Sequence, residues 1–272
     1  EEAQQAMDWR ALGHGSAPPA LAGHAAVTMQ VAAGSFGPSL PFATADRVGE
    51  GAAVMLVIGV EAAQLPQAAR QATPTRTVST VGNDQQAVLA AALGASLRTW
   101  ALLVETREWA VPKVLGMPPA ARFAHAAALV AGAGVVVFGG VEPGGGPLPC
   151  DWSILALTDA QWAWRRLEVR TEPGAAPPEA CYGHSLTALS APHPLTGVVG
   201  PALLLFGGQA MQSGKLMTRA YLMHLDMTAG ALYCQRLKES PNAPCPRSYH
   251  TVSAVGEERY AVVMGGRGAG GQ

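Results

Sequence analysis

Short apolar runs that end in glycine recur along this chain, separated by polar and Gly/Pro-rich stretches. Three copies end in a glycine pair, at 135–140 (VVVFGG), 203–208 (LLLFGG) and 261–266 (AVVMGG), and a degenerate copy lies at 55–60 (MLVIGV). The runs do not alternate between apolar and polar positions, as expected of strands that are covered on both faces. Glycine lets the chain turn where a side chain would clash or need a disfavoured φ. The pattern therefore predicts buried strands of an all-β protein.

A histidine precedes each apolar run, and a proline lies six residues before each histidine. An aromatic residue follows the copies: Trp164 and Tyr233 lie 25 and 26 residues after the first glycine of their pairs. Successive histidines are 101, 59 and 66 residues apart. The histidines are His24, His125, His184 and His250, and the prolines are Pro18, Pro119, Pro178 and Pro244.

This ordered set resembles the kelch repeat, in which Pro-x-x-Arg-x-x-His precedes an apolar strand ending in Gly-Gly and a tryptophan lies near the end. Arg122 and Arg247 match the arginine of the motif, whereas Leu21 and Cys181 depart from it. The resemblance covers nearly the whole chain and implies a β-propeller of four-stranded antiparallel blades. Because a kelch unit is about 50 residues long, the excess length is expected to be loop.

The resemblance gives the repeated residues structural roles. Each histidine is expected at an equivalent place in a different blade, where a neutral imidazole would satisfy backbone groups between blades. Each aromatic residue is expected to fill the wedge between adjacent sheets. The structural positions are His24, His125, His184, His250, Gly139, Gly140, Gly207, Gly208, Gly265, Gly266, Trp9, Trp109, Trp164 and Tyr233.

The order of these positions predicts one incomplete propeller over 1–272. Trp9 precedes His24 by 15 residues, much as Trp109 precedes His125 by 16, so Trp9 is expected in the last strand of a preceding blade. We therefore expect a segment of a longer protein; the alternative is a small ring closed by the strand of Trp9. The predicted pieces are a lone strand at 7–12, blades at 24–110, 125–167 and 184–237, and a half blade at 250–266.

Long connections are the candidate binding elements, because loops on a rigid scaffold usually carry function. The insertion at 61–97 has coil-like sequence first and then apolar residues at helical spacing, which predicts a helix over 84–97. An idle surface elaboration is the alternative for this insertion. A further loop, 190–200, is expected on the opposite face. The candidate partner-binding residues are Glu142, Gln212, Lys215, Arg219, Leu89 and Leu93.

Composition narrows the choice of partners. Hydrophobic residues make up 49% of the chain and charged residues 14%, and the net charge is −1. This near-neutral charge balance does not suggest a nucleic acid or an anionic membrane as partner. The apolar stretch 124–141 is broken by Ala-Gly-Ala-Gly, which favours two short strands over a spanning helix. The four cysteines form no C-x-x-C pair, and no Cys/His group has zinc-site spacing. From this use of cysteine we expect a reduced, intracellular chain, cytoplasmic or cytoskeletal.

No catalytic motif is found: neither a Gly-x-Ser-x-Gly elbow nor a Walker loop is present. The expectation is a non-enzymatic scaffold or adaptor that binds other proteins through its loops, such as a subunit of a cytoskeletal or ciliary assembly, with no cofactor and no metal. The alternative is the kelch portion of an enzyme, either a copper radical oxidase or a multidomain methyltransferase. The copper ligands of the oxidases cannot be matched to residues here by any local motif.

Overall fold

The computed structural model describes residues 14–15, 21–31, 52–61, 96–143, 146–157, 162–258 and 260–269. Within these ranges every regular element is a β-strand, as the sequence predicts. No helix in the described part of the chain is long and apolar enough to cross a membrane. Trp9, Leu89 and Leu93, and the lone strand predicted at 7–12, lie outside the described residues.

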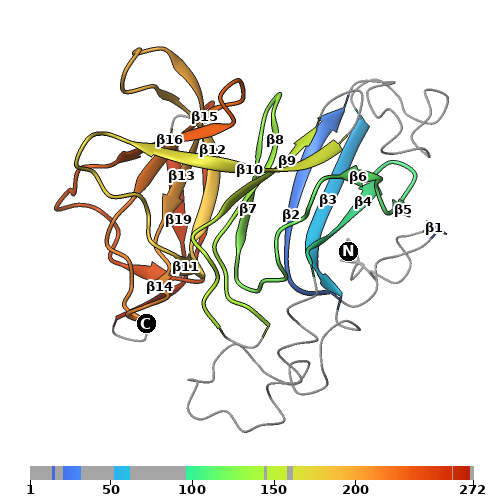
Figure 1. The fold of residues 1–272 in the computed structure, drawn as a ribbon, viewed down its shortest axis with the longest axis horizontal. Coiled ribbons are helices and arrows are strands. Elements are labelled where there is room, and N and C mark those ends of the chain that lie inside the picture. The colour runs from blue at the N-terminus through green and yellow to red at the C-terminus, as the bar shows by residue number, and fades with distance from the viewer. Residues whose placement is uncertain are drawn as a thin grey trace, which may run out of the picture.

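Three sheets are built in the same way, each from four consecutive antiparallel strands (Figure 1). We call these sheets blades 1 to 3. The strands of blade 1 are β2 (Leu21–Val31), β3 (Ala52–Glu61), β4 (Arg98–Leu103) and β5 (Glu108–Ala110). Blade 2 consists of β7 (Ala126–Val130), β8 (Gly134–Phe138), β9 (Trp152–Leu157) and β10 (Trp162–Thr171). Blade 3 consists of β12 (Ser185–Pro192), β13 (Val199–Phe206), β15 (Tyr221–Asp226) and β16 (Ala231–Arg236).

A half blade follows blade 3. It consists of β18 (Thr251–Val255) and β19 (Tyr260–Met264), paired antiparallel. The first strands β2, β7, β12 and β18 are spatial neighbours in that order, so the sheets stand side by side around them. Tyr260 and Met264 on one face of the half blade are 69% and 65% exposed.

Successive blades are also joined at their outer strands. The C-terminal part of β10 leaves blade 2 and pairs in parallel with β16 of blade 3. Likewise β6 (Val114–Leu115) pairs in parallel with β10, and β1 (His14–Gly15) with β5. In all three cases the chain that precedes a blade's first strand adds an outer strand to that same blade.

The core lies between the blades. Val135 and Val137 of β8 pack toward blade 1 in one buried cluster, together with Trp164. Val136 and Phe138 of the same strand pack toward blade 3 in a second cluster. This burial on both faces explains why the run does not alternate in the sequence. The ring of Phe138 stacks on that of Trp152, with centroids 3.8 Å apart and an interplanar angle of 12°.

Three local predictions differ from the structure. The insertion in blade 1 is shorter than predicted, since Glu61 belongs to β3 and Leu97 is a buried core residue. The predicted helix cannot reach Leu97, because Ser96 forms a β-bridge with Ala120 and the Leu97 amide donates to the Pro119 carbonyl (3.0 Å). The loop predicted at 190–200 is also shorter, since β12 and β13 extend to Pro192 and Val199.

Candidate partner-binding face

One end of the blades carries the connections between second and third strands and those between successive blades. We call this end the loop face; in the described part of the chain its segments are 111–125, 139–143, 146–151, 172–184, 207–220 and 237–250. In Figure 1, β11 (Cys181–Tyr182) and β14 (Gln209–Ala210) mark this end beside the C-terminus. The turns within β12–β13, β15–β16 and β18–β19 lie at the opposite end.

Blades 2 and 3 and the half blade each hold the roots of their loops with a small antiparallel ladder. The ladder is a single bridge between Phe123 and Val141 in blade 2 and the β11–β14 pair in blade 3. In the half blade β17 (Arg247–Ser248) pairs with β20 (Arg267–Gly268). The loops therefore leave the blades from fixed positions.

Neighbouring blades are also connected by backbone hydrogen bonds through the residues that precede the histidines. The Tyr249 amide donates to the Gly183 carbonyl (2.7 Å), and the Gly183 amide donates to the Ala124 carbonyl (2.9 Å). All three residues have positive φ, 55°, 62° and 51° in that order. Left-handed backbone is unusual for alanine and tyrosine, and the sequence offers only Gly183 as a sign of it.

His184 and His250 each pack on the first glycine of the pair in the preceding blade. A Cβ at Gly139 would overlap His184, and one at Gly207 would lie 2.6 Å from Cε1 of His250. The second glycine of each pair lies against the histidine of its own blade: a Cβ at Gly208 would be 2.7 Å from the Cβ of His184. In blades 2 and 3 both glycines of the pair are therefore required by close approach as well as by backbone conformation, whereas Gly265 of the half blade has open space around its Cβ position.

Three of the four histidines share this buried environment. His125, His184 and His250 are 8%, 6% and 7% exposed. His24 differs, because it is exposed beside an irregularity in the β2–β3 register and so does not share the buried setting expected from the repeat. The imidazole of His250 has the Ser185 hydroxyl at 2.9 Å, and Nδ1 of His184 has the Cys181 sulfur at 3.4 Å.

A Gly139→Ala variant tests the contact between blades 2 and 3. We expect it to cost about 3 kcal/mol, because the new Cβ both strains a residue with positive φ and overlaps His184. Gly132→Ala is the matched control, since Gly132 has a similar φ (72° against 68°) and open space around its Cβ position. That control should cost only about 1 kcal/mol. Equal losses in urea unfolding would contradict the contact.

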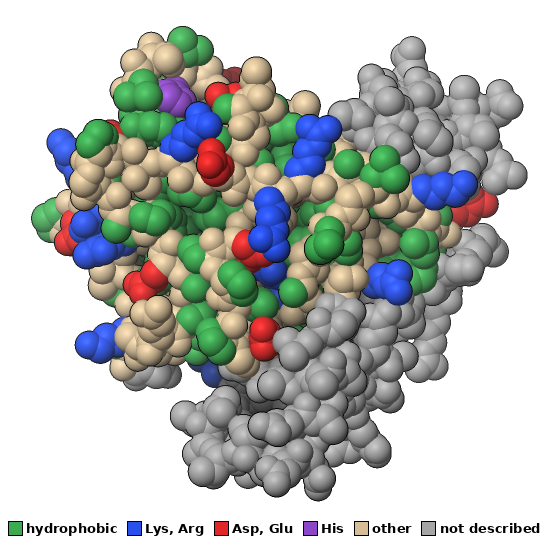
Figure 2. All heavy atoms as spheres, viewed as in Figure 1, with side chains coloured by type: hydrophobic (Ala, Val, Ile, Leu, Met, Phe, Trp, Pro, Cys, Tyr) green, Lys and Arg blue, Asp and Glu red, His purple; other side chains and the backbone are tan. Residues whose placement is uncertain are grey.

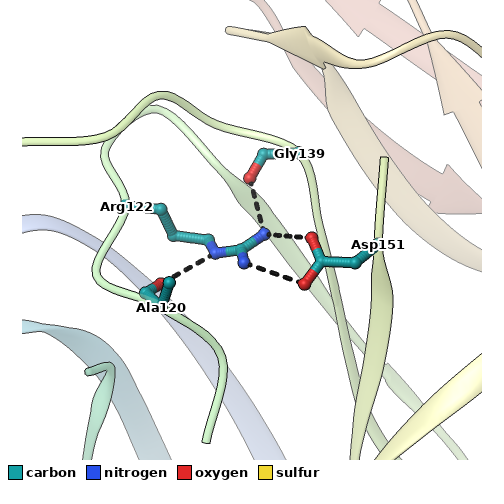
Figure 3. Close-up of polar contacts among 4 residues, drawn as sticks. All are labelled: Ala120, Arg122, Gly139 and Asp151. Carbon is teal, nitrogen blue, oxygen red and sulfur yellow. Dashed lines mark hydrogen bonds and ion pairs between the residues drawn. The ribbon is translucent and has the colours of Figure 1, made fainter. Parts of the chain in front are cut away.

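Arg122 fastens the loop face of blade 2 from inside (Figure 3). Its guanidinium is bidentate to the Asp151 carboxylate, with both contacts at 3.2 Å. It also donates to the carbonyls of Gly139 (3.1 Å) and Ala120 (3.0 Å). Arg122 is 1% exposed. Arg247 makes the equivalent bond to Gly265 (2.9 Å), so the motif arginines hold the strand that ends in Gly-Gly.

The predicted binding residues of the two described loops lie on the loop face. Gln212, Lys215 and Arg219 are exposed on the connection from β14 to β15, and Glu142 is half-buried on the connection from β8 to β9. The two loops have similar roots, with bridges from Val141 to Pro147 and from Gln209 to Leu216. Glu142 belongs to blade 2, and the other three residues belong to the neighbouring blade 3.

The aromatic residues expected between sheets behave differently from one another. Trp164 is 6% exposed within the cluster between blades 1 and 2. Trp109 is half-buried, and Tyr233 packs against the ring of His193 (5.1 Å). Between blades 2 and 3 the wedge is filled by Trp152 of the third strand, which the sequence did not single out.

The chemistry of the described residues is that of a packed scaffold. Burial raises the pKa of the Cys150 thiol to about 11 and that of Cys234 to about 12, which disfavours a nucleophilic thiolate. Burial also raises the pKa of Cys181. In the part of the chain that the structure describes, no group of three or more His, Cys, Asp or Glu side chains is arranged to hold a metal ion.

Comparison with known proteins identifies the repeat. Residues 93–268 match the family described as the KLHDC2/KLHL20/DRC7 Kelch-repeats domain. The chain belongs to the kelch-repeat family. The kelch repeats predicted from the Pro–His–Gly-Gly pattern are thus confirmed.

Curated relatives of this kelch chain are longer proteins. An F-box/kelch-repeat protein of Arabidopsis thaliana is 25% identical over 177 residues, which are 63% of this chain and 34% of the plant protein. The Rab9 effector protein with kelch motifs of Xenopus laevis is 34% identical over 104 residues, 38% of this chain and 24% of that protein. The kelch chain thus spans between a quarter and a third of the length of these relatives.

A solved structure supports the fold. The structure of YjhT aligns with 95% of this kelch chain and 65% of its own length, with a TM-score of 0.53 and 16% sequence identity. At this identity the likeness bears on fold alone, and it confirms the predicted class of kelch-type β-propeller.

Proposed function

We propose that this kelch chain is a non-enzymatic interaction module that binds another protein through its loop face. The observation that carries the proposal is the construction of that face. Its loops carry exposed polar residues, and their positions are fixed by antiparallel ladders at their roots and by backbone hydrogen bonds between blades. Rigid presentation lowers the entropy lost when a loop binds a partner. The similarity to an F-box/kelch-repeat protein and to a Rab9 effector supports the same role.

The finer assignments stay predictions from the sequence. They are a place in a cytoskeletal or ciliary assembly, an intracellular location, and the absence of nucleic acid, membrane and cofactor among the partners. No observation on the described residues favours the alternative of an enzyme portion.

Alanine variants on the two ends of the blades test the proposal. The loop-face variant combines Gln212→Ala, Lys215→Ala and Arg219→Ala. The control variant combines Arg107→Ala, Thr228→Ala and Glu257→Ala, which are exposed at the opposite end. Quantitative affinity capture should show a partner whose recovery falls at least about tenfold with the loop-face variant, since a few central residues dominate binding energy. The control should capture as wild type does.

The opposite pattern would overturn the proposal. If the control variant loses the captured proteins and the loop-face variant retains them, the binding face is the end of the strand turns. If both variants retain every captured protein, the loop of blade 3 has no part in binding. Both variants should unfold at the wild-type urea concentration, because the substituted side chains are exposed.

A further inference from the structure

Four basic side chains gather on the loop face of blade 3 and the half blade. They are Lys215, Arg219, Arg247 and Arg267, and we call them the basic cluster. Lys215, Arg219 and Arg267 are exposed, and Arg247 is half-buried. None of the four is part of the ion pairs found among the described residues, which join Arg122 to Asp151, Arg170 to Glu168 and Arg236 to Glu239.

A chain of hydrogen bonds brings these residues together. The Met217 amide, between Lys215 and Arg219, donates to the Gly208 carbonyl (2.9 Å). The Gly208 amide donates in turn to the Arg247 carbonyl (2.8 Å). Arg267 follows through the ladder of the half blade, in which it pairs with Ser248. The cluster is therefore a fixed feature of the seam between blade 3 and the half blade.

The sequence immediately around the cluster residues is poor in acidic side chains. Stretches 207–225, 240–256 and 260–269 contain no Asp or Glu. Asp226, Glu257 and Glu258 are exposed in turns at the opposite end, whereas Glu172, Glu179 and Glu239 are exposed on the loop face. Glu239 is paired there with Arg236 (2.8 Å). Because the whole chain has a net charge of only −1, the positive potential at the loop face is local.

On the outer surface of the blades, basic and acidic side chains lie close together. Figure 2 shows basic and acidic side chains interspersed over the surface that β10 crosses. Arg170 on β10, for example, lies 3.3 Å from Glu168. Exposed arginines of β10 therefore provide a matched control for charge alone.

An aromatic side chain completes the cluster. Tyr249 is 42% exposed. Burial raises the pKa of the Tyr249 hydroxyl, and the nearby positive charge of Arg267 acts in the opposite direction. Its ring covers Gly183. A partner at this seam would meet cations that can bind carboxylates, Arg219 and Arg267 in a bidentate manner, beside an apolar ring. The Arg247 guanidinium adds positive charge while it donates to Gly265 and Cys245.

We infer that the basic cluster docks an acidic segment of the partner protein, an inference that rests on the proposed function. Charge complementarity supports this occupant, because clustered cations attract and orient an acidic partner. A nucleic acid fits less well. Glu142 and Glu179 also lie on the loop face, and four cations without a wider basic field are few for a polyphosphate.

Fluorescence anisotropy with a fluorescein-labelled octaglutamate peptide tests the inference on the whole chain. The cluster variant carries Lys215→Glu, Arg219→Glu and Arg267→Glu. The control carries Arg165→Glu, Arg166→Glu and Arg170→Glu on the exposed side of β10, with the same change in net charge. We expect wild type and control to bind within about twofold of each other and the cluster variant at least about tenfold more weakly. Raising NaCl from 50 to 300 mM should weaken wild-type binding several-fold.

Three results would overturn the inference. They are no binding by wild type at 50 mM NaCl, an equal loss in both variants, and tighter binding of an oligothymidine of equal length that depends on the same three residues. If the peptide fails while the alanine variants of the β14–β15 connection still lose their captured partner, acidic recognition falls and the proposed function stands. If those alanine variants also retain every captured protein, both fall.

Discussion

The Arg122→Met substitution is expected to lower the free energy of unfolding by about 3–5 kcal/mol, which is the cost of removing one partner of a buried ion pair. The substitution keeps an unbranched apolar side chain in place of the arginine stem but leaves the Asp151 carboxylate and the carbonyls of Gly139 and Ala120 without their donor. Urea unfolding measures the change, and the melting temperature should fall by roughly 10 °C.

Two further variants separate the buried pair from charge in general. Arg170→Met removes an exposed pair whose side chains are 55% and 73% exposed, so it should cost less than about 1 kcal/mol. Adding Asp151→Leu to Arg122→Met should recover part of the loss, because no buried carboxylate is then left unpaired. A loss at Arg122 as small as that at Arg170 would contradict the fastening role assigned to this guanidinium.

Mild acid is expected to destabilise the chain through the buried histidines between the blades. Burial lowers the pKa of His125 to about 4, with the Arg122 charge acting in the same direction. Burial, followed by the charges of His125 and His250, lowers the pKa of His184 to about 3. Both imidazoles are therefore neutral in the folded chain at pH 5, whereas in the unfolded chain they bind protons below about pH 6.5.

The sign follows from proton uptake. Between pH 6.5 and the folded pKa values the unfolded state binds more protons, so stability present above pH 6.5 is lost as the pH falls. From pH 7.5 to 5 each of the two histidines should account for about 2 kcal/mol of this loss. Urea unfolding over this range should show a loss in His184→Gln that is smaller than in wild type by about 2 kcal/mol. Equal losses would contradict burial of His184 as a neutral ring.

Much of the fold could be predicted from the sequence because the repeat carries it. Gly139, Gly207 and Gly265 mark strand ends at equivalent places, and the strands before them end where the apolar runs end, at Phe138, Phe206 and Met264. The degenerate first copy was harder to interpret. There His24 is exposed, although the proline spacing alone predicts it to be equivalent to the other histidines.

The parts that the sequence did not predict depend on contacts between blades. Asp151 shows no pattern of its own, and its role appears only when Arg122 is placed opposite it. The left-handed backbone at Ala124 and Tyr249 accompanies hydrogen bonds to Gly183 of the neighbouring blade 3. Trp152 fills a wedge expected for a fourth-strand aromatic residue, because stacking on Phe138 depends on which residues face each other across the ladder.

The loop face could be predicted only as a set of loops. Strand order places Gln212, Lys215 and Arg219 at one end of the blades, and alternating connections are enough to expect that. The basic cluster adds Arg247 and Arg267 from the half blade, which become neighbours of that loop through the bond from Gly208 to Arg247. Sequence spacing between repeats does not reveal such a contact.

Site-specific photo-crosslinking tests the central claim, that the loop face binds a protein partner, most directly. A benzophenone amino acid is placed at Gln212 on the loop face in one chain and at Thr228 at the opposite end in another, both exposed positions of blade 3. We predict a discrete protein adduct from position 212 on illumination in cells and none of that mass from position 228. Adducts from position 228 alone, or no adduct from position 212, would contradict the account.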